Sequence, residues 1–465
     1  IQSMYQIVKS CVRCGNGEGL TDFLFCQKGL KQGEITSPLL FSLFINELAV
    51  DVMNNGKHGA QIYPGLYELI ILLFADDVAL ISFTPVGLQH QLNLLAENAD
   101  KLDLTVNLEK SSIVIFRKGG YIASRERWFY KTEAMKIVNA YNYLGIWFST
   151  RLSFSHSLNK QTAKGKAGVI EIFKTMWTLG DVTPSIVFKL FDSQVKPMLL
   201  YGSEVWGLQN NLSIERVHLF TLKKLLNVSP KTPNDMVYSE TGRLPLWIDA
   251  KLNVIRYWLR LTRMENNRLP RKAYNMLCNI HGNGKDCWVS DVQKNLMIFG
   301  FGFVWLNQGV QHVKWFLREY KERLSDCWKQ GWHERITERG RYSVYRLFKT
   351  ELFMEPYFHC IQNKKLQDIF IRFRLGISDI KTHKQRFCND PNPDLSCPMC
   401  KCRLEDEMHF LFFCEATKDL RQKYLFFANK KKFRKQPLSM LSDDEHAYNV
   451  ARFIYYSLKL RNMEQ

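Results

Sequence analysis

The feature that most constrains this chain is a pair of adjacent aspartates, Asp76 and Asp77, between two short apolar segments. Residues 69–73 before the pair and 78–81 after it are entirely aliphatic. Apolar runs of this length, separated by a tight turn, predict a buried β-hairpin with two carboxylates at its tip. A carboxylate beside a buried strand is costly unless it is paired or binds a metal, and oxygen-only ligands favour magnesium or manganese. The alternative is a solvated Asp-Asp turn without a metal.

A polar loop and an amphipathic helix precede this hairpin by about forty residues. The loop ends at Gly33, which allows close backbone approach, and Gln32 beside it offers two donors and an acceptor. Ser37 is the expected N-cap of the helix, and Pro38 suits its first position. The predicted buried face of the helix consists of Leu40, Phe41, Phe44, Ile45 and Leu48.

The order of glycine loop, capped helix and hydrophobic-Ala-Asp-Asp hairpin resembles the palm of reverse transcriptases, specifically the non-LTR (LINE-type) retrotransposon family. An amphipathic helix over residues 88–102, followed by Asn107-x-x-Lys110, is similar to the next segment of that palm. Residues 141–146 resemble the strand-turn that grips the primer end. Residues 195–207 resemble the helical region that follows the polymerase core.

The resemblance implies a role for each matching residue. Asp76 would coordinate a catalytic Mg²⁺ or Mn²⁺, and Asp77 would bind metal or support the site locally. Lys110 would face the incoming triphosphate as a contact or proton donor, although a plain surface lysine is the alternative. The nucleotide and template pocket would include Gln32, Gly33, Phe74 and Ala75. The primer grip would comprise Tyr143, Leu144 and Gly145.

One expected carboxylate is missing. Polymerases of this kind hold two metals with carboxylates from two palm strands, and the family places one aspartate in an aromatic-hydrophobic-Asp strand upstream of the glycine loop. Only 28 residues precede Gly29, the chain begins with Ile1, and Asp22 lies in a segment that matches a connecting strand. We therefore expect an N-terminally truncated polymerase that does not polymerise by itself.

The amino-acid composition limits the classes of partner that the chain is expected to bind. Lys and Arg together number 64 against 45 Asp and Glu, a formal net charge of +19, which favours a polyanionic partner. No apolar run approaches the roughly 20 residues of a membrane-spanning helix, so we expect no membrane partner. The 12 cysteines are scattered and do not form a secreted disulfide framework. We expect a nuclear protein that is also cytoplasmic as a ribonucleoprotein.

The second motif is a set of cysteines and a histidine with the spacing C-x2-C-x8-H-x4-C. Zinc prefers nitrogen and sulfur ligands, and four protein ligands make a structural site. Cys402 lies close enough to replace the second cysteine. The segment resembles the C-terminal zinc knuckle of LINE proteins, whose role in the family is to grip nucleic acid. The predicted ligands are Cys397, Cys400, His409 and Cys414.

Beyond residue 148 the sequence predicts mainly helices. Lys160, Lys164 and Lys166 line a predicted thumb helix, where they either track a template-primer backbone or form a solvated face. Tryptophans interleaved with basic residues over 310–330 could stack bases, but we favour core packing for them.

Together these observations predict an α+β chain: a partial right-hand polymerase fold (fingers and palm), a helical thumb, and a helical C-terminal region with a zinc knuckle. The predicted domain boundaries are 1–148, 149–210, 211–390 and 391–465. The expected function is RNA-directed DNA polymerisation in target-primed reverse transcription, with an RNA template, a DNA primer or target, dNTPs, Mg²⁺ (or Mn²⁺) and structural Zn²⁺. The alternative is a non-catalytic, zinc-dependent RNA- or DNA-binding protein, or a relic, derived from such an element.

Overall fold

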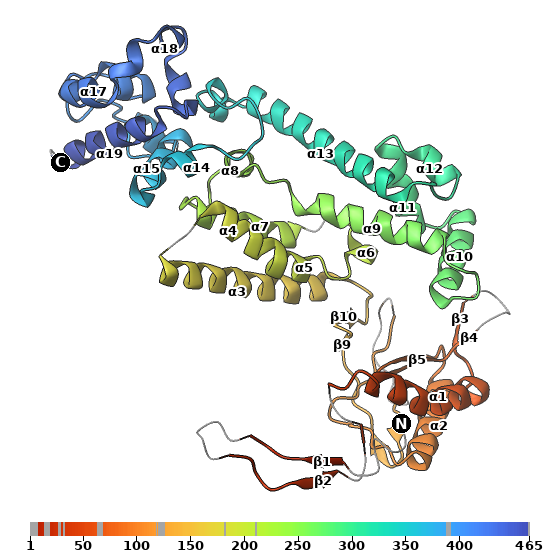
Figure 1. The fold of residues 1–465 in the computed structure, drawn as a ribbon. Helices are drawn as coiled ribbons and strands as arrows, with labels where there is room; N and C mark the ends of the chain where they lie inside the picture. Colours follow the sequence, from red (N-terminus) through yellow and green to blue (C-terminus); the bar gives the residue numbers. More distant parts are fainter. Residues whose placement is uncertain are drawn as a thin grey trace. The chain divides into compact units, whose positions relative to one another are not determined.

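The computed structural model divides the chain into two compact units (Figure 1). The first unit comprises residues 1–141 and 149–152, and the second comprises residues 142–148 and 153–465. Side chains and backbone are described for residues 8–13, 19–26, 29–30, 33–62, 68–117, 119, 126–180, 183–209, 212–386 and 392–463, except for the side chain of Cys26.

Short antiparallel hairpins and two helices build the first unit. The helices are α1 (Ser37–Asn55) and α2 (Pro85–Lys101). The strands are β1 (Val8–Ser10), β2 (Leu24–Cys26), β3 (Ala60–Gln61), β4 (Glu68–Leu69), β5 (Ile71–Phe74), β6 (Asp77–Leu80), β7 (Phe129–Tyr130) and β8 (Glu133–Ala134), with β9 (Ala140–Tyr143) and β10 (Ile146–Ser149) at the boundary between the units. In the described part of the chain each strand pairs in a two-stranded sheet.

Helix α1 confirms the predicted helix but corrects its details. Its N-cap is Thr36, whose side chain makes no capping hydrogen bond, so the Ser37 cap was wrong. Ser37 is instead a buried residue of the first turn. Ile45 and Leu48 face the core as predicted, whereas Phe44 is 46% exposed. Residue 44 lies about 100° around the helix from residue 45, which takes its side chain off the buried stripe.

Helix α2 confirms the second predicted helix. The Thr84 hydroxyl oxygen caps its N-terminus by accepting from the backbone N–H of Gly87 at 3.0 Å. Leu92, Leu95 and Ala99 are buried on one face. The apolar run Ile113-Val114-Ile115-Phe116 also predicts a strand. That prediction was wrong, because among the described residues this segment forms only an isolated bridge, between Ile113 and Ile137.

The second unit is helical. Its elements, in chain order, are α3 (Ser155–Leu179), α4 (Pro184–Leu190), η2 (Phe191–Val195), α5 (Lys196–Leu199), α6 (Ser203–Trp206), α7 (Leu212–Leu225), α8 (Asn234–Thr241), α9 (Leu246–Thr262), α10 (Leu269–Gly282), α11 (Trp288–Ile298), α12 (Gly302–Leu306), α13 (Val313–Glu338), η3 (Gly340–Tyr342), η4 (Tyr345–Leu347), α14 (Tyr357–Cys360), α15 (Lys364–Arg374), α16 (Lys381–Gln385), η5 (His409–Phe413), η6 (Glu415–Thr417), α17 (Lys418–Tyr424), η7 (Phe426–Asn429), α18 (Lys431–Lys435), η8 (Pro437–Ser442) and α19 (Ala447–Met463). Among the described residues, no helix is both long and apolar enough to span a bilayer.

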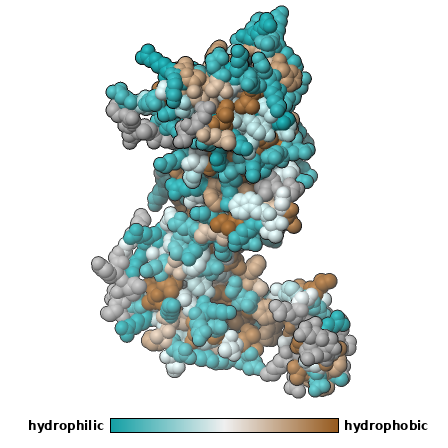
Figure 2. Space-filling model, turned by 90° about the vertical axis from the view of Figure 1, so that its left-hand side faces the viewer, coloured by the Kyte–Doolittle hydropathy of each residue, from teal (hydrophilic) through white to brown (hydrophobic). Residues whose placement is uncertain are grey.

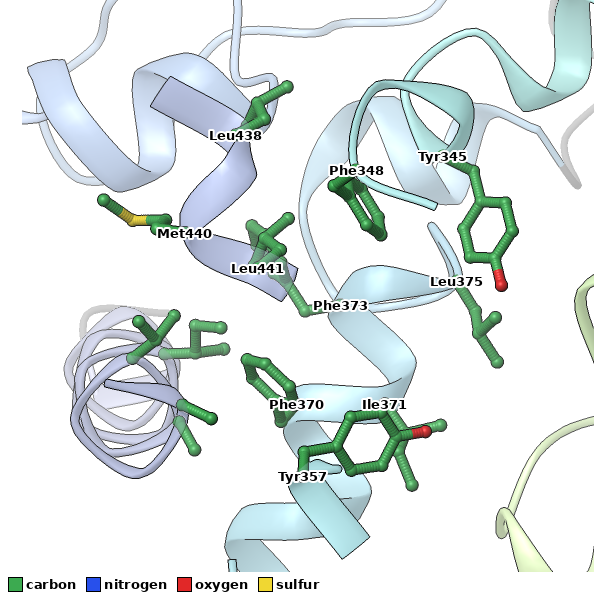
Figure 3. Close-up of a cluster of buried hydrophobic side chains, with 14 of the residues drawn as sticks. Tyr345, Phe348, Tyr357, Phe370, Ile371, Phe373, Leu375, Leu438, Met440 and Leu441 are labelled. Atoms are coloured by element: carbon green, nitrogen blue, oxygen red, sulfur yellow. The ribbon is translucent and has the colours of Figure 1, made fainter. Parts of the chain in front are cut away.

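Three hydrophobic clusters form the core of the second unit. The first joins α3, η2 and α7, and the second joins α9, α11 and α13. The third gathers around α15 and α19 and contains Phe370, Phe373 and Leu441 (Figure 3). Its buried members run from Leu222 to Leu458, so segments on both sides of residue 390 share one core. The predicted domain boundaries stay predictions.

The tryptophans of the C-terminal helices divide between core and surface. Trp328 packs against two of the clusters, as expected for a core residue. Trp332, which lies beyond the predicted stretch, is also buried. Trp315 is 57% exposed, so the core assignment was wrong for this residue. Trp315 lies in the first turn of α13, where its side chain points outside the buried stripe that begins at Phe316.

Candidate functional site

The aspartate pair lies at the tip of the β5–β6 hairpin, which confirms the predicted hairpin. The strands are antiparallel, with Ile71 opposite Leu80 and Phe74 opposite Asp77. Ala75 and Asp76 form the two-residue turn, and Asp77 is the first residue of β6. Ala75 has a φ of +51°, a conformation uncommon outside glycine. Such strained positions cluster at active sites, where the surrounding structure holds them.

Burial differs along the hairpin. Ile71 is buried, whereas Phe74 is 61% exposed and both aspartates are exposed. The prediction of a buried hairpin therefore holds at its base and not at its tip. In the described part of the chain, neither Asp76 nor Asp77 has a hydrogen-bond or ion-pair partner for its carboxylate. Two adjacent, unpaired carboxylates on a rigid turn are a donor set that suits a hard divalent cation.

The two other predicted elements of the nucleotide site lie in the same unit. Gln32 lies outside the described residues, and Gly33 is exposed with a φ of +87°. Lys110 is exposed at the end of a turn. Its backbone N–H donates to Asn107 Oδ1 at 3.1 Å, and its carbonyl accepts from the Tyr141 hydroxyl at 2.8 Å. Asn107 and Lys110 thus belong to one turn, which the hydrogen bond between the Asn107 side chain and the Lys110 backbone closes.

The predicted primer-grip residues form the β9–β10 turn. Leu144 and Gly145 have φ values of +50° and +82°, as in the tight turns that two-residue hairpins prefer. The Tyr201 hydroxyl donates to the Leu144 carbonyl at 2.7 Å. The Tyr201 ring also lies 3.1 Å from the point where a Cβ on residue 145 would stand, and this close approach, with the positive φ, favours glycine there. Sequence reasoning missed Tyr201 as a support for this turn.

Asp76, Asp77 and Lys110 belong to the first unit, and residues 143–145 belong to the second. The roles assigned to these residues remain predictions.

The four predicted zinc ligands converge in the second unit. Their ligand atoms all lie within 4.8 Å of one another. The sulfurs of Cys397 and Cys414 are 3.9 Å apart, and Cys400 Sγ lies 3.3 Å from His409 Nε2. Tetrahedral zinc with bonds of about 2.3 Å to sulfur and 2.0 Å to nitrogen needs edges of about 3.8 and 3.5 Å. The cluster therefore fits a zinc ion.

Local backbone geometry explains how these ligands meet. The N–H of Cys397 donates to the Cys402 carbonyl at 2.8 Å, and Lys401 closes the turn with a φ of +60°. The π-helical turn η5 then places His409 so that its carbonyl accepts from the Cys414 N–H at 2.8 Å. Cys402 is exposed and, among the described residues, lies outside the ligand cluster. The geometry thus favours Cys400 as the ligand.

The thiols of the cluster require a cation to ionise. Burial, together with the neighbouring thiols Cys397 and Cys400, raises the pKa of Cys414 to about 12. Burial also raises the pKa of Cys397. Bound zinc supplies the positive charge that converts such thiols to thiolates.

The acidic stretch before His409 anchors this cluster. Glu405 is fully buried and accepts two hydrogen bonds from Arg461 of α19, at 3.0 and 3.1 Å. Asp406 Oδ1 accepts from the N–H of His409 at 2.7 Å, and Glu407 lies 2.8 Å from His383 Nε2. The sequence pattern did not predict these contacts, because the partners of Glu405 and Glu407 lie 56 and 24 residues away.

Known proteins are similar to this chain over the first unit and over part of the second. Residues 1–148 match the family model described as reverse transcriptase (RNA-dependent DNA polymerase). The chain is 23% identical over 263 residues to the Pol polyprotein of the type-1 retrotransposable element R2 of Popillia japonica, covering 54% of this chain and 40% of that protein. It is 21% identical over 252 residues to the RNA-directed DNA polymerase from mobile element jockey of Drosophila melanogaster, covering 52% of this chain and 26% of that protein.

The matches to these two relatives span less than half of the length of those proteins. The β5–β6 hairpin and the turn at residues 144–145 lie within the range matched by the family model. The family model and both retrotransposon relatives agree with the motif order in the sequence. By family, residues 1–148 are therefore a reverse transcriptase domain, and the two relatives support a non-LTR (LINE-type) retrotransposon reverse transcriptase.

Proposed function

We propose that the chain acts in RNA-directed DNA polymerisation, as part of target-primed reverse transcription with an RNA template, a DNA primer or target, and dNTPs. The observation that carries this proposal is the β5–β6 hairpin, which presents Asp76 and Asp77 as unpaired, exposed carboxylates within a domain of the reverse transcriptase family.

Asp76 and Asp77 would hold Mg²⁺ or Mn²⁺. When bound, such metals stabilise the attacking and leaving oxygens of an in-line displacement. The template and nucleotide pocket would be shaped by Gln32, Gly33, Phe74 and Ala75. Lys110 would contact the triphosphate. Residues 143–145, supported by Tyr201, would hold the primer terminus.

Structural zinc would be held by the cluster of Cys397, Cys400, His409 and Cys414. The knuckle around this cluster would bind nucleic acid. The net charge of +19 supports a polyanionic partner. On the face drawn in Figure 2, hydrophobic residues form separate patches within a mainly hydrophilic surface. We place the protein in the nucleus and, as a ribonucleoprotein, in the cytoplasm.

The test is incorporation of labelled dNTPs into a DNA primer on an RNA template, by protein produced from the full open reading frame. The Asp76→Ala variant should abolish incorporation, because it removes a metal ligand. Asp22→Ala is the matched control, since Asp22 is also an exposed aspartate of the first unit and lies outside the hairpin. Incorporation that survives Asp76→Ala would overturn the proposal.

The Cys/His cluster and the basic charge also fit a second function, zinc-dependent nucleic-acid binding without catalysis. Salt-sensitive binding is expected in both cases. Binding without any incorporation by the wild-type protein would favour this second function.

A further inference from the structure

A groove of about 580 Å³ lies beside the C-terminal ends of α3 and α7 in the second unit. Its walls combine an exposed tryptophan, a second aromatic ring and three cations, with no carboxylate among the lining residues. These five side chains are Trp177, Phe220, Arg216, Lys223 and Lys224.

Among the described residues, the cations of this groove have no acidic partner. In the described part of the chain, Arg216 has no hydrogen-bond or ion-pair partner for its side chain. Lys224 places its ammonium 4.4 Å from the centroid of the Trp177 ring. Lys223 Nζ donates to the Pro230 carbonyl at 2.7 Å, and burial lowers its pKa. One carboxylate contact is indirect: Asn227, which also lines the groove, donates to Asp368, and Asp368 is itself paired with Lys364 at 2.7 Å.

The Trp177 side chain has neighbours on its own and the adjacent helix but stays exposed to solvent. Its ring lies 6.0 Å from the ring of Phe173 on the same helix, and Lys224 lies over it. Its side chain is nevertheless 58% exposed, whereas tryptophan side chains are highly buried on average. An exposed aromatic face beside unneutralised cations is the arrangement by which proteins bind single-stranded nucleic acids: bases stack on the ring while the cations hold the backbone phosphates.

We infer that the α3–α7 groove is a binding site for single-stranded nucleic acid, with a base stacked on Trp177 and phosphates held by Arg216, Lys223 and Lys224. The site lies on the helical region after the polymerase core, and none of the predicted polymerase or zinc residues lines it. It adds a strand-binding function to the proposed polymerase. Its test measures binding without dNTPs or added divalent metal, so it can fail or succeed independently of polymerase activity.

The test uses the full chain and fluorescently labelled oligonucleotides of about 12 nucleotides, within the usual site size for such grooves. Three probes are compared by anisotropy: oligo(dT), oligo(rU) and an abasic strand of the same length. Trp177→Ala should weaken binding of the base-bearing strands by about 5- to 150-fold, the range expected for one lost stacking contact. It should leave abasic binding unchanged. The ratio between the dT and rU probes identifies DNA or RNA as the preferred strand.

The salt dependence separates the two parts of the site. Lys224→Gln removes one phosphate contact and should reduce the slope of log K against log salt by about 0.7. Trp177→Ala should leave that slope unchanged. Trp177→Phe keeps an aromatic face and should retain most of the affinity. Trp315→Ala is the matched control, because Trp315 is equally exposed at 57% and lies beside Lys314.

Cross-linking locates the strand directly. Photoactivation of a 5-bromouracil oligonucleotide, followed by trypsin digestion, should label the peptide of residues 175–189, which contains Trp177. Labelling confined to other peptides, such as residues 315–318, would overturn the inference. So would equal losses for Trp177→Ala and Trp315→Ala, or equal weakening of the abasic probe, since the surface would then bind only through charge.

Discussion

Replacement of Arg374 by methionine tests how the C-terminal core is held together. Arg374 is fully buried, and its guanidinium lies between two buried carboxylates. It lies 3.0 Å from Glu240 and 2.8 Å from Glu355, and stacks over the ring of Phe348 at 4.9 Å. Lys349, which pairs with Glu355, completes a network of two positive and two negative side chains.

The expected loss follows from charge balance. Methionine keeps most of the buried stem of arginine but leaves one uncompensated negative charge in the core. Glu240 would retain only two donors, the hydroxyls of Tyr345 at 2.7 Å and Tyr357 at 2.6 Å. Breaking one partner of a buried ion pair typically costs about 3–5 kcal/mol. That is a large share of the roughly 5–15 kcal/mol that stabilises a domain.

The double variant Arg374→Met/Glu240→Gln removes both opposite charges. Tyrosine hydroxyls can still donate to the glutamine carbonyl, and the Lys349–Glu355 pair remains neutral overall. We therefore expect the double variant to recover about 2–3 kcal/mol of the loss, as the coupling energy of residues in direct contact. Arg374→Lys, which keeps the charge but loses the bidentate fork, should fall between wild type and Arg374→Met.

Hydrogen exchange on peptides from α15 and α19 is the appropriate assay, because a chain with two units need not unfold in one step. A loss of about 3–5 kcal/mol corresponds to exchange about 10² to 10⁴ times faster in these helices. A change below about fivefold for Arg374→Met would refute the reasoning. A double variant no more protected than Arg374→Met would show that uncompensated charge is not the cause.

Two further outcomes follow from the structure. Purified protein should contain about one zinc per chain, and Cys400→Ser should lose it whereas Cys402→Ser should keep it, as measured by elemental analysis; equal zinc loss in both variants would contradict the ligand assignment. Burial raises the pKa of Asp249, but the hydrogen bond and charge of Lys196 and the charge of Lys321 outweigh it and hold this pKa below its usual value. Because the unfolded chain then binds the proton more tightly, the stability that Asp249 contributes is present above about pH 4 and is lost as the pH falls toward its folded pKa. Circular dichroism of acid unfolding should therefore show a shallower decline for Asp249→Asn than for wild type between about pH 4.5 and 2.5, and an unchanged decline would count against this role.

Local patterns allowed several elements to be predicted. Two aliphatic runs around Asp76 and Asp77 predicted the β5–β6 hairpin. Strand formation and a tight turn both depend on residues that are neighbours in the sequence, so the sequence pattern is sufficient to indicate them. The spacing of the three cysteines and His409 indicated the metal cluster, since a turn and one helical step suffice to bring the ligands together. The buried face of α2 could be predicted for the same reason, because its apolar residues recur at helical spacing.

Predictions failed where a neighbour from another segment decided the outcome. The apolar run at Ile113 predicts a strand, but among the described residues it forms only an isolated β-bridge, with Ile137, and no paired strand. Phe44 and Trp315 are apolar residues whose exposure depends on which helix face meets the core. The sequence pattern narrows that face to a stripe, and packing selects the residues within it.

The sequence by itself therefore determined the family motifs, the hairpin with its aspartate pair, the basic charge and the four ligands of the cluster. Only the tertiary structure decided that Tyr201 supports the turn at Leu144, that Arg461 anchors Glu405, and that Trp177 meets Lys224 in an open groove. The physical reason is range. Turn and helix geometry acts over a few residues, whereas these partners are separated by 47 to 57 residues and meet only because helices pack.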